Sequence, residues 1–270
     1  MSSTPRDGQP EPAWKRHLGT ALHRFPVVAR SGAGPAYLRW QRRRRRAARR
    51  AAEANGDVSL SRPSLHGLDD KLDRWIGDLH GGYFVEAGAN DGFEQSNTYH
   101  LERFRGWSGL LVEPIPHLHR EAVLERPGSR VVHAALVAPE QDGEQLTLQY
   151  GGLMSVVSGA RGSAAEDEAY VAQAFSLGLE APMQVSAPGR TLSGLLDEAG
   201  APEIDLMSLD LEGFEPVALR GLDLERHAPR LLLVEVQDAV HREAVERALG
   251  ERYRFAALLT HHDALYERVG

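Results

Sequence analysis

Four short apolar runs, each ending in a carboxylate, constrain the fold of this 270-residue chain more than any other feature. The runs are residues 83–86, 109–113, 204–210 and 231–235, and the acids that tip them are Glu86, Glu113, Asp210 and Glu235. Apolar runs of this length between turn-forming residues predict buried strands. The segments between them leave room for helices, which predicts an α/β fold with a mostly parallel sheet.

The first run leads into a turn that is rich in glycine. Its turn-forming residues are Gly88, Asn90, Asp91 and Gly92, and a helix is expected over 96–105. A strand, a tight turn and a helix present backbone N–H groups to a ligand. The spacing lacks the middle glycine that lets a pyrophosphate approach, and the strand ends in Glu86. The pattern suits a cationic ligand without phosphate, such as S-adenosylmethionine; the alternative is a tight turn beside a solvated acid.

The second run places Glu113 where a ribose is usually bound. Glu113 lies 21 residues beyond Gly92, at the predicted tip of the neighbouring strand, and Pro114 stops that strand. An acid at this distance from the glycine turn is placed to accept hydrogen bonds from both ribose hydroxyls. The alternative is a glutamate that only caps the following helix.

The later acids are candidates for chemistry. Asp210 and Glu212 lie on a predicted strand-to-helix turn, where two carboxylates can serve proton transfer or bind a cation. Asp210 and Glu235 end two strands and could share Mg²⁺, although nothing in the sequence requires the ion. His261 lies between the last two predicted strands, 255–259 and 264–269, and is an alternative base.

The charge divides the chain into two parts. Residues 1–62 hold 14 Arg and Lys against 4 Asp and Glu, a balance of +10, whereas residues 63–270 hold 17 against 34, a balance of −17. We expect a basic N-terminal arm followed by one acidic domain. The arginine run 42–46 lies in a segment that favours a helix. It could contact nucleic acid or an anionic membrane surface, stay solvated, or rest on the acidic domain.

Composition narrows the class of protein. The chain has no cysteine, which rules out disulfides and cysteine metal sites and fits a reducing cytosol. It has neither an apolar run of about 18 residues, as a membrane helix requires, nor the apolar segment of a secretory signal. These features predict a cytoplasmic protein.

The remaining pattern predicts further elements and a covering segment. Helices are expected over 65–79, where Ser64 is the N-cap, and over 191–199. Strands are expected over 131–137 and, running antiparallel, over 146–150. Residues 151–189 are rich in Gly, Ala and Ser, with a helical patch over 164–175. We expect an insertion that closes over a site as a lid, or else an ordinary surface excursion.

Two blocks of the sequence resemble the FkbM-type S-adenosylmethionine-dependent methyltransferases. The first comprises residues 83–92 with 96–98, 106–107 and 111–114. The second, residues 204–215 with Gly221, is similar to the family's Asp-x-Glu-Gly-x-Glu signature. The likeness spans about residues 66–260 and leaves the arm outside.

The resemblance implies a class I methyltransferase (Rossmann-like) fold: a seven-stranded, mostly parallel sheet with an antiparallel last strand and helices on both faces. It implies methylation of a hydroxyl on a sugar, glycan or polyketide-type small molecule. Carried over by position, the residues at the donor are Glu86, Gly88, Asn90, Asp91, Gly92, Asn97, Glu113 and Pro114. Asp210 and Glu212 would face the acceptor.

Our hypothesis gives Asp210 the role of base and Glu212 that of orienting the acceptor. One rival is an RNA-directed methyltransferase that holds phosphate with the arginine run, although the balance of −17 around the site would repel a polyanion. The other rival is a non-catalytic scaffold of the same fold, which the retention of the acids disfavours.

Overall fold

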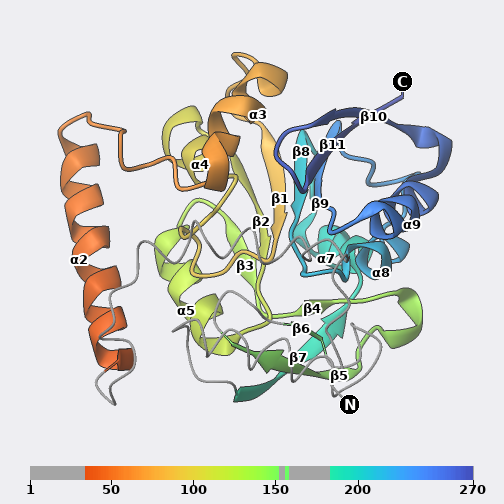
Figure 1. The fold of residues 1–270 in the computed structure, drawn as a ribbon, viewed down its shortest axis with the longest axis horizontal. Coiled ribbons are helices and arrows are strands. Elements are labelled where there is room, and N and C mark those ends of the chain that lie inside the picture. Colours follow the sequence, from red (N-terminus) through yellow and green to blue (C-terminus); the bar gives the residue numbers. More distant parts are fainter. Residues whose placement is uncertain (1–33, 152–155, 158–182, 270) are drawn as a thin grey trace, which may run out of the picture.

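The computed structural model describes residues 34–151, 156–157 and 183–269, and its centre is a seven-stranded sheet in the order β10-β11-β9-β8-β1-β2-β3 (Figure 1). The strands are β1 (Tyr83–Ala87), β2 (Ser108–Val112), β3 (Arg130–Val132), β8 (Leu206–Leu209), β9 (Leu231–Glu235), β10 (Tyr253–Leu258) and β11 (Asp263–Arg268). Strand β11 runs antiparallel to both β9 and β10, while the other pairings are parallel. The predicted fold class is confirmed.

Helices cover both faces of this sheet. On one face α3 (Leu68–Ile76) and α4 (Tyr99–Arg105) pack on Phe84, Leu111 and Leu231. On the other, α7 (Leu192–Ala199), α8 (Glu215–Arg220) and α9 (Ala239–Leu249) pack on Val85, Leu110 and Leu232. Alternate residues of one strand therefore serve opposite cores, as a strand buried on both sides requires.

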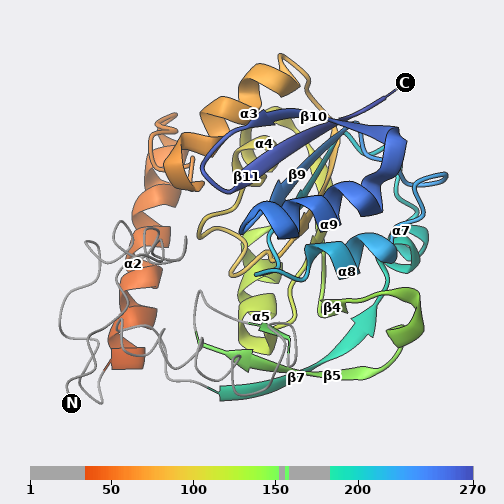
Figure 2. The ribbon, with the colours of Figure 1, turned by 45° about the vertical axis from the view of Figure 1, so that its right-hand side comes forward.

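A second sheet lies across the carboxyl ends of the central strands (Figures 1 and 2). It has the order β4-β7-β5-β6, from β4 (Ala135–Leu136), β7 (Met183–Arg190), β5 (Gln145–Tyr150) and β6 (Val156–Val157). Strand β5 is antiparallel to both its neighbours, as predicted. Because Leu146, Leu148 and Ala187 share a small core with β4, this sheet has a packing layer of its own.

The single strand predicted over 131–137 is wrong. The chain leaves the central sheet after β3 and enters the second sheet at β4, so the two halves of that apolar run pair with different partners. Between them, the ring nitrogen Nε2 of His133 lies 2.9 Å from the carbonyl oxygen of Pro114, which ties the crossover to the end of β2. An apolar run shows burial but does not show which sheet buries it.

The helix predicted over 65–79 is also shorter than expected. It begins with the 3-10 turn η2 (Leu65–Gly67), and α3 follows from Leu68 to Ile76. His66 has a φ of 55°, which interrupts the α-helical path. Ser64 still acts at the entrance, since its Oγ accepts a hydrogen bond from the backbone N–H of Asp69 at 2.7 Å.

Two further 3-10 turns, η3 (Pro139–Gln141) and η4 (Gly250–Arg252), connect strands and helices, and α5 (Pro116–Glu125) lies between β2 and β3. The predicted insertion contributes residues 183–189 to β7, and its helical patch at 164–175 lies outside the described residues. The lid role stays a prediction.

The arginine-rich segment forms α2 (Gly34–Ala54), which confirms the expected helix. Its second half contacts the loop after β1 through Arg46, α5 through Arg49 and α4 through Glu53. Among the described residues, no helix is both long and apolar enough to cross a membrane.

Candidate active site

A cavity opens where β1, β2 and β8 end, between the central sheet and the second sheet. Its walls include eight of the residues predicted from sequence: Glu86, Gly88, Asn90, Asn97, Glu113, Pro114, Asp210 and Glu212. Ala135, Leu136 and Leu148 of the second sheet close one side. Parallel strands deliver their carboxyl ends to one edge, so acids distant in sequence meet at one cavity.

The turn after β1 must approach β8 closely. Gly88 has a φ of 80°, and a Cβ atom there would lie 2.0 Å from the carbonyl oxygen of Asp210. Asn90 follows with a φ of 51°, a conformation that asparagine tolerates better than most residues. Backbone contact between the two turns therefore requires glycine at position 88.

Strained backbone is concentrated around the cavity. Four non-glycine residues in the described part of the chain have positive φ, and three of them, Asn90, Gln95 and Glu212, line the cavity. The left-handed region is costly for glutamine and glutamate, and such strain is typical of functional sites. Both turns at the sheet edge are thus held in conformations that local preference alone would not select.

Glu86 is already paired within the protein. It is 4% exposed, and its carboxylate accepts hydrogen bonds from the Asn97 backbone N–H at 2.7 Å and the Thr98 hydroxyl at 2.6 Å. The guanidinium of Arg126, whose side chain is fully buried, lies 3.2 Å away. Glu86 therefore shapes the loop that carries Asn97, and its charge is balanced without a ligand.

Sequence reasoning missed Arg126. Its guanidinium also donates to the Gly92 carbonyl, Ser96 Oγ, Thr98 Oγ1 and Glu102. A single arginine after a helix carries no motif, and only the buried Glu86 signals that a countercharge must lie nearby.

Asp91 and Gly92 lie behind the cavity wall and do not line it. Asp91 Oδ1 accepts the backbone N–H groups of Phe93 and Glu94, and its Oδ2 pairs with Arg46 at 3.0 Å. Gly92 packs on α5, where a Cβ atom would lie 3.0 Å from Ala122 Cα. Both residues hold the loop in place from outside.

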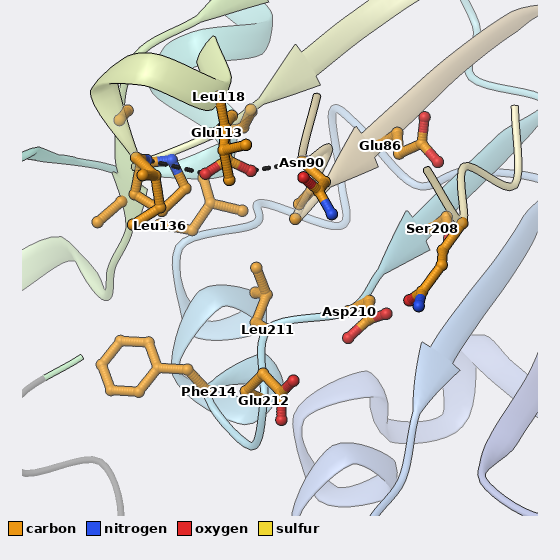
Figure 3. A pocket seen from close by; sticks show the side chains of 18 of the residues that line it. Glu86, Asn90, Glu113, Leu118, Leu136, Ser208, Asp210, Leu211, Glu212 and Phe214 are labelled. Carbon is orange, nitrogen blue, oxygen red and sulfur yellow. Dashed lines mark hydrogen bonds between the residues drawn. The ribbon is translucent and has the colours of Figure 1, made fainter. Parts of the chain in front are cut away.

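Glu113 faces the cavity from the end of β2 (Figure 3). Its Oε2 accepts from the Asn90 backbone N–H at 2.7 Å and its Oε1 from the Ile115 N–H at 2.8 Å. Burial raises the pKa of the Glu113 carboxyl to about 8, despite these two donors. Each oxygen keeps a lone pair that can accept a ligand hydroxyl.

Asp210 and Glu212 lie across the cavity from Glu113 (Figure 3). Asp210 is reachable from the cavity, yet protein packed around its carboxyl raises the pKa of Asp210 well above the ordinary range. Repulsion from Glu212 and Glu215 adds to this effect. Asp210 therefore lines the same cavity as Glu113.

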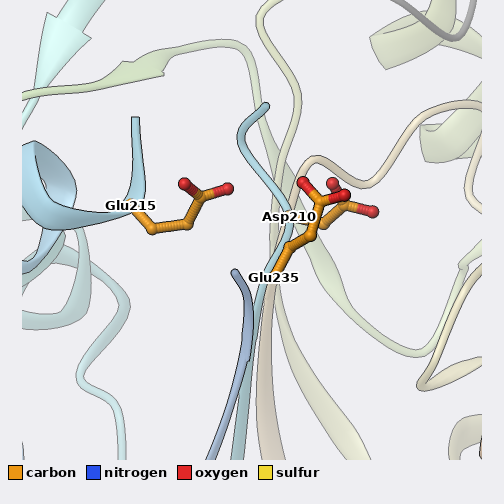
Figure 4. A group of neighbouring side chains, drawn as sticks. All are labelled: Asp210, Glu215 and Glu235. Atoms are coloured by element: carbon orange, nitrogen blue, oxygen red, sulfur yellow. The ribbon is translucent and has the colours of Figure 1, made fainter. Parts of the chain in front are cut away.

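Asp210, Glu215 and Glu235 converge next to the cavity, with the Glu215 carboxylate directed at the other two (Figure 4). One oxygen from each lies within 4.8 Å of the others. Glu215 is 0% exposed; its Oε1 accepts the Leu211 N–H at 2.6 Å, whereas its Oε2 has no hydrogen-bond partner within the described structure. His241 Nε2 is 3.1 Å from that oxygen.

Glu215 belongs to the signature in the sequence, but the sequence did not indicate its role. Its contact with the Leu211 N–H shows that it closes the turn on which Asp210 and Glu212 lie. Glu235 is brought beside Asp210, as expected for two adjacent strand ends, and burial followed by repulsion from Asp210 raises its pKa well above the usual range.

His261 lies at the same edge of the sheet but does not line the cavity. Its ring packs on those of His66 and His262, with centroids 5.2 Å and 4.0 Å away. The structure therefore brings Asp210, and not His261, into the space that Glu113 faces.

The lining matches the parts of S-adenosylmethionine. Around Glu113 it is largely apolar, with Ile115, Leu118 and Leu136, which suits a flat base next to a ribose. Toward Asn97 and Ser208, where Asn97 Nδ2 donates to Ser208 Oγ at 3.1 Å, it is polar, which suits the amino-acid end. The residues present fit this donor.

Comparison with known proteins gives distant matches to solved structures and a match to one family model. No curated protein matches the chain. A TehB-like SAM-dependent methyltransferase from Corynebacterium glutamicum is 11% identical, with 83% of this chain and 98% of that chain covered and a TM-score of 0.41. The putative methyltransferase yhhF from Escherichia coli is 12% identical, with 76% and 88% covered and a TM-score of 0.37. These likenesses are distant, and the fold assignment depends on the sheet order itself.

The direct match is to a family model, the methyltransferase FkbM domain, over residues 86–263. The matched region runs from Glu86, near the end of β1, to the first residue of β11 and contains every residue that lines the cavity. The chain therefore belongs to the FkbM methyltransferase family and is an S-adenosylmethionine-dependent methyltransferase.

Proposed function

We propose that the protein transfers the methyl group of S-adenosylmethionine to a hydroxyl oxygen of a small molecule, a sugar, glycan or polyketide-type compound. The observation that supports this best is the placement of Asp210 and Glu212 on the cavity that also holds Glu113. A donor bound by its ribose at Glu113 would extend toward these acids. An acceptor hydroxyl is therefore expected between the donor and Asp210.

S-adenosylmethionine supplies a methyl group on a sulfonium, which is a good leaving group. The chain's residues must align the acceptor oxygen with it, and alignment supplies much of the rate in such displacements. The Asp210 carboxylate would take the hydroxyl proton as the acceptor oxygen gains the methyl carbon and the sulfur keeps the electrons of the C–S bond. Glu212, on the same turn, is placed to orient the acceptor by a hydrogen bond.

Replacement of the base tests this proposal. Asp210→Asn keeps the shape of the side chain but removes its ability to take a proton, so we expect turnover to fall roughly 10²-fold or more. Donor binding, measured by calorimetry with S-adenosylhomocysteine, should stay near the wild-type value because Glu113 and Asn90 are untouched. Unchanged turnover of Asp210→Asn would remove Asp210 from the mechanism.

The substrate class also needs a direct test. The cavity wall holds Glu94, Asp210 and Glu212, which disfavours phosphate-rich acceptors. We expect methylation of neutral polyols or glycosides, and none of RNA. Methylated RNA without methylated small molecules would favour the RNA-directed rival, and calorimetry that shows no heat with the donor would favour the scaffold.

Mg²⁺ is a second candidate feature of the site, supported by the convergence of the carboxylates of Asp210, Glu215 and Glu235. These residues would offer three carboxylate oxygens, the ligand type that Mg²⁺ prefers, although Glu215 Oε2 already faces His241 Nε2 at 3.1 Å. A divalent cation there would lower the pKa of an acceptor hydroxyl. Full activity after chelation and gel filtration would exclude it, whereas restoration by Mg²⁺ alone, together with calorimetric Mg²⁺ binding that Glu235→Gln abolishes, would support it.

A further inference from the structure

Helix α2 packs against the outer side of the loop that supplies one wall of the cavity. Residues 88–98 connect β1 to α4, and the part of this loop after Gly92 contributes Glu94, Gln95 and Asn97 to the cavity. Helix α2 lies at one side of the molecule, next to α5 (Figure 1), and precedes the family match that begins at residue 86. The helix therefore adds contacts to the site that the matched region alone does not contain.

Arg49 is the centre of this contact. It is 2% exposed, and its guanidinium stacks 3.7 Å from the centroid of the Phe93 ring and 4.7 Å from that of Tyr99. The two rings meet edge to face, with centroids 4.8 Å apart. Because Phe93 and Tyr99 flank residues 94–98, one side chain fixes both ends of the segment that lines the cavity.

Ion pairs hold that guanidinium in position. Arg49 pairs with Glu125 of α5 and, at 3.3 Å, with Glu53 one turn along its own helix. Glu53 in turn accepts a hydrogen bond from the Tyr99 hydroxyl at 2.9 Å and one from Arg103 at 2.9 Å. A planar guanidinium can lie flat on a ring while its N–H groups pair with carboxylates, whereas the compact ammonium of lysine offers no planar face to stack.

The contacts of Arg49 bear on the position of the loop because the backbone of the loop is strained. Gln95 has a φ of 63°, and the loop contains no glycine after Gly92 to relieve the strain. Strained backbone persists only where its surroundings fix it. From inside, Glu86 and Arg126 bond to residues 96–98, and from outside Arg49 clamps the two aromatic rings. Loss of either set would let Gln95 and Asn97 move.

We propose that Arg49 is a positioning residue for the methyltransferase site, acting through Phe93 and Tyr99 on the wall formed by residues 94–97. The proposal rests on the proposed function only in that the cavity binds the methyl donor. It is independent of the acceptor and of the base. It makes α2, which carries the arginine run, part of the catalytic unit.

The first test compares two substitutions on α2. Arg49→Lys keeps a charge for Glu53 and Glu125 but loses the planar stack, so we expect donor affinity, measured with S-adenosylhomocysteine, to fall on the order of tenfold. Hydrogen exchange of residues 93–98 should become faster in the same variant. Arg45→Ala is the matched control, because Arg45 is exposed on the same helix and forms no ion pair with the residues that the structure describes.

Phe93→Leu provides a second variant in case Arg49→Lys folds poorly. It removes the ring under the guanidinium and leaves the ion pairs of Arg49 in place. Like Arg49→Lys, it should lower the donor affinity and speed hydrogen exchange of residues 93–98. Lower thermal stability in both variants, with unchanged donor affinity and unchanged exchange at 93–98, would show a purely structural role and overturn the proposal. Absence of donor binding in the wild type would instead defeat the proposed function itself.

Discussion

Gly88 is the residue at which side-chain size has the largest expected effect. Its φ of 80° and the 2.0 Å approach of the Asp210 carbonyl oxygen to its Cβ position leave no room for even one methyl group. Since Gly88 lies on the cavity wall, a change there would alter both the turn after β1 and the turn that carries Asp210.

We therefore expect Gly88→Ala to destabilise the protein by about 2 kcal/mol or more and to abolish donor binding. Urea unfolding and calorimetry measure the two effects. Gly143→Ala is the matched control: Gly143 has a similar φ of 83°, but nothing lies within 4 Å of its Cβ position, so it reports the cost of the backbone conformation alone. Equal effects of the two substitutions would contradict the proposed close contact.

Glu113 predicts a pH dependence of stability in the donor-free protein. Burial raises its pKa from 4.5 to about 8, and the charge of Asp91 adds to the shift. Between these values the folded protein keeps a proton that the unfolded chain releases, so the contribution of Glu113 to stability is lost as pH rises.

Comparison with Glu113→Gln, which does not titrate, isolates this effect. The wild-type free energy of unfolding minus that of the variant should fall between about pH 5 and about pH 8, by at most about 1.4 kcal/mol per pH unit. Urea unfolding at several pH values measures it. A difference that is constant over this range, or that rises, would show that Glu113 is ionised in the folded protein.

The strand-end acids could be found from sequence because apolar runs are regular and their ends are marked. Glu113 and Asp210 needed only the rule that parallel strands deliver their carboxyl ends to one edge. The partners of Glu86 could not be found this way, since Arg126 lies 40 residues away and no local pattern joins them. Asp91 and Gly92 belong to the same turn, yet which side of it faces the cavity depends on α5 and α2.

The loop after β1 is the element whose position depends most on buried packing. It is joined to the sheet by the buried pair of Glu86 and Arg126, 3.2 Å apart, and breaking a buried pair on one side leaves an uncompensated charge.

A double-mutant cycle measures this coupling. We expect Arg126→Met alone to cost about 3–5 kcal/mol of unfolding free energy and the Glu86→Gln/Arg126→Met double variant to cost clearly less than the sum of its single changes. Calorimetry with S-adenosylhomocysteine should show weaker binding in every variant that still folds. Additive losses would mean that Glu86 and Arg126 act independently.

Element order was more predictable than element pairing. The strands of the central sheet and the antiparallel last strand follow from periodicity and the family resemblance. The division of 131–137 between two sheets could not be predicted in this way, because β4 pairs with β7, which lies more than 40 residues later in the chain. The kink at His66 likewise has no signal in the apolar spacing that predicted one helix over 65–79.

At the scale of the whole molecule, the basic arm and the acidic domain meet. Arg46 pairs with Asp91 and Arg49 pairs with Glu125. Of the possibilities given for the arginine-rich segment, contact with the acidic domain is therefore the one seen for these two residues. Arg43, Arg44 and Arg45 are exposed and form no ion pair with the described residues. Contact of this surface with an anionic membrane, and a cytoplasmic location, are proposals.

Vesicle sedimentation tests the membrane contact. We expect binding to vesicles with anionic lipid that weakens as salt rises, and a loss of about 1 kcal/mol per arginine when Arg43, Arg44 and Arg45 are replaced by alanine. Neutral vesicles serve as the control. Equal binding by wild type and triple variant would leave the exposed arginines without a role in membrane contact.

The most direct test of the account is a crystal structure with S-adenosylhomocysteine bound. We predict both ribose hydroxyls within hydrogen-bond distance of the Glu113 carboxyl, and the thioether sulfur on the side of the cavity that Asp210 and Glu212 line. Product bound elsewhere, or bound with its ribose away from Glu113, would contradict both the donor site and the role given to Asp210.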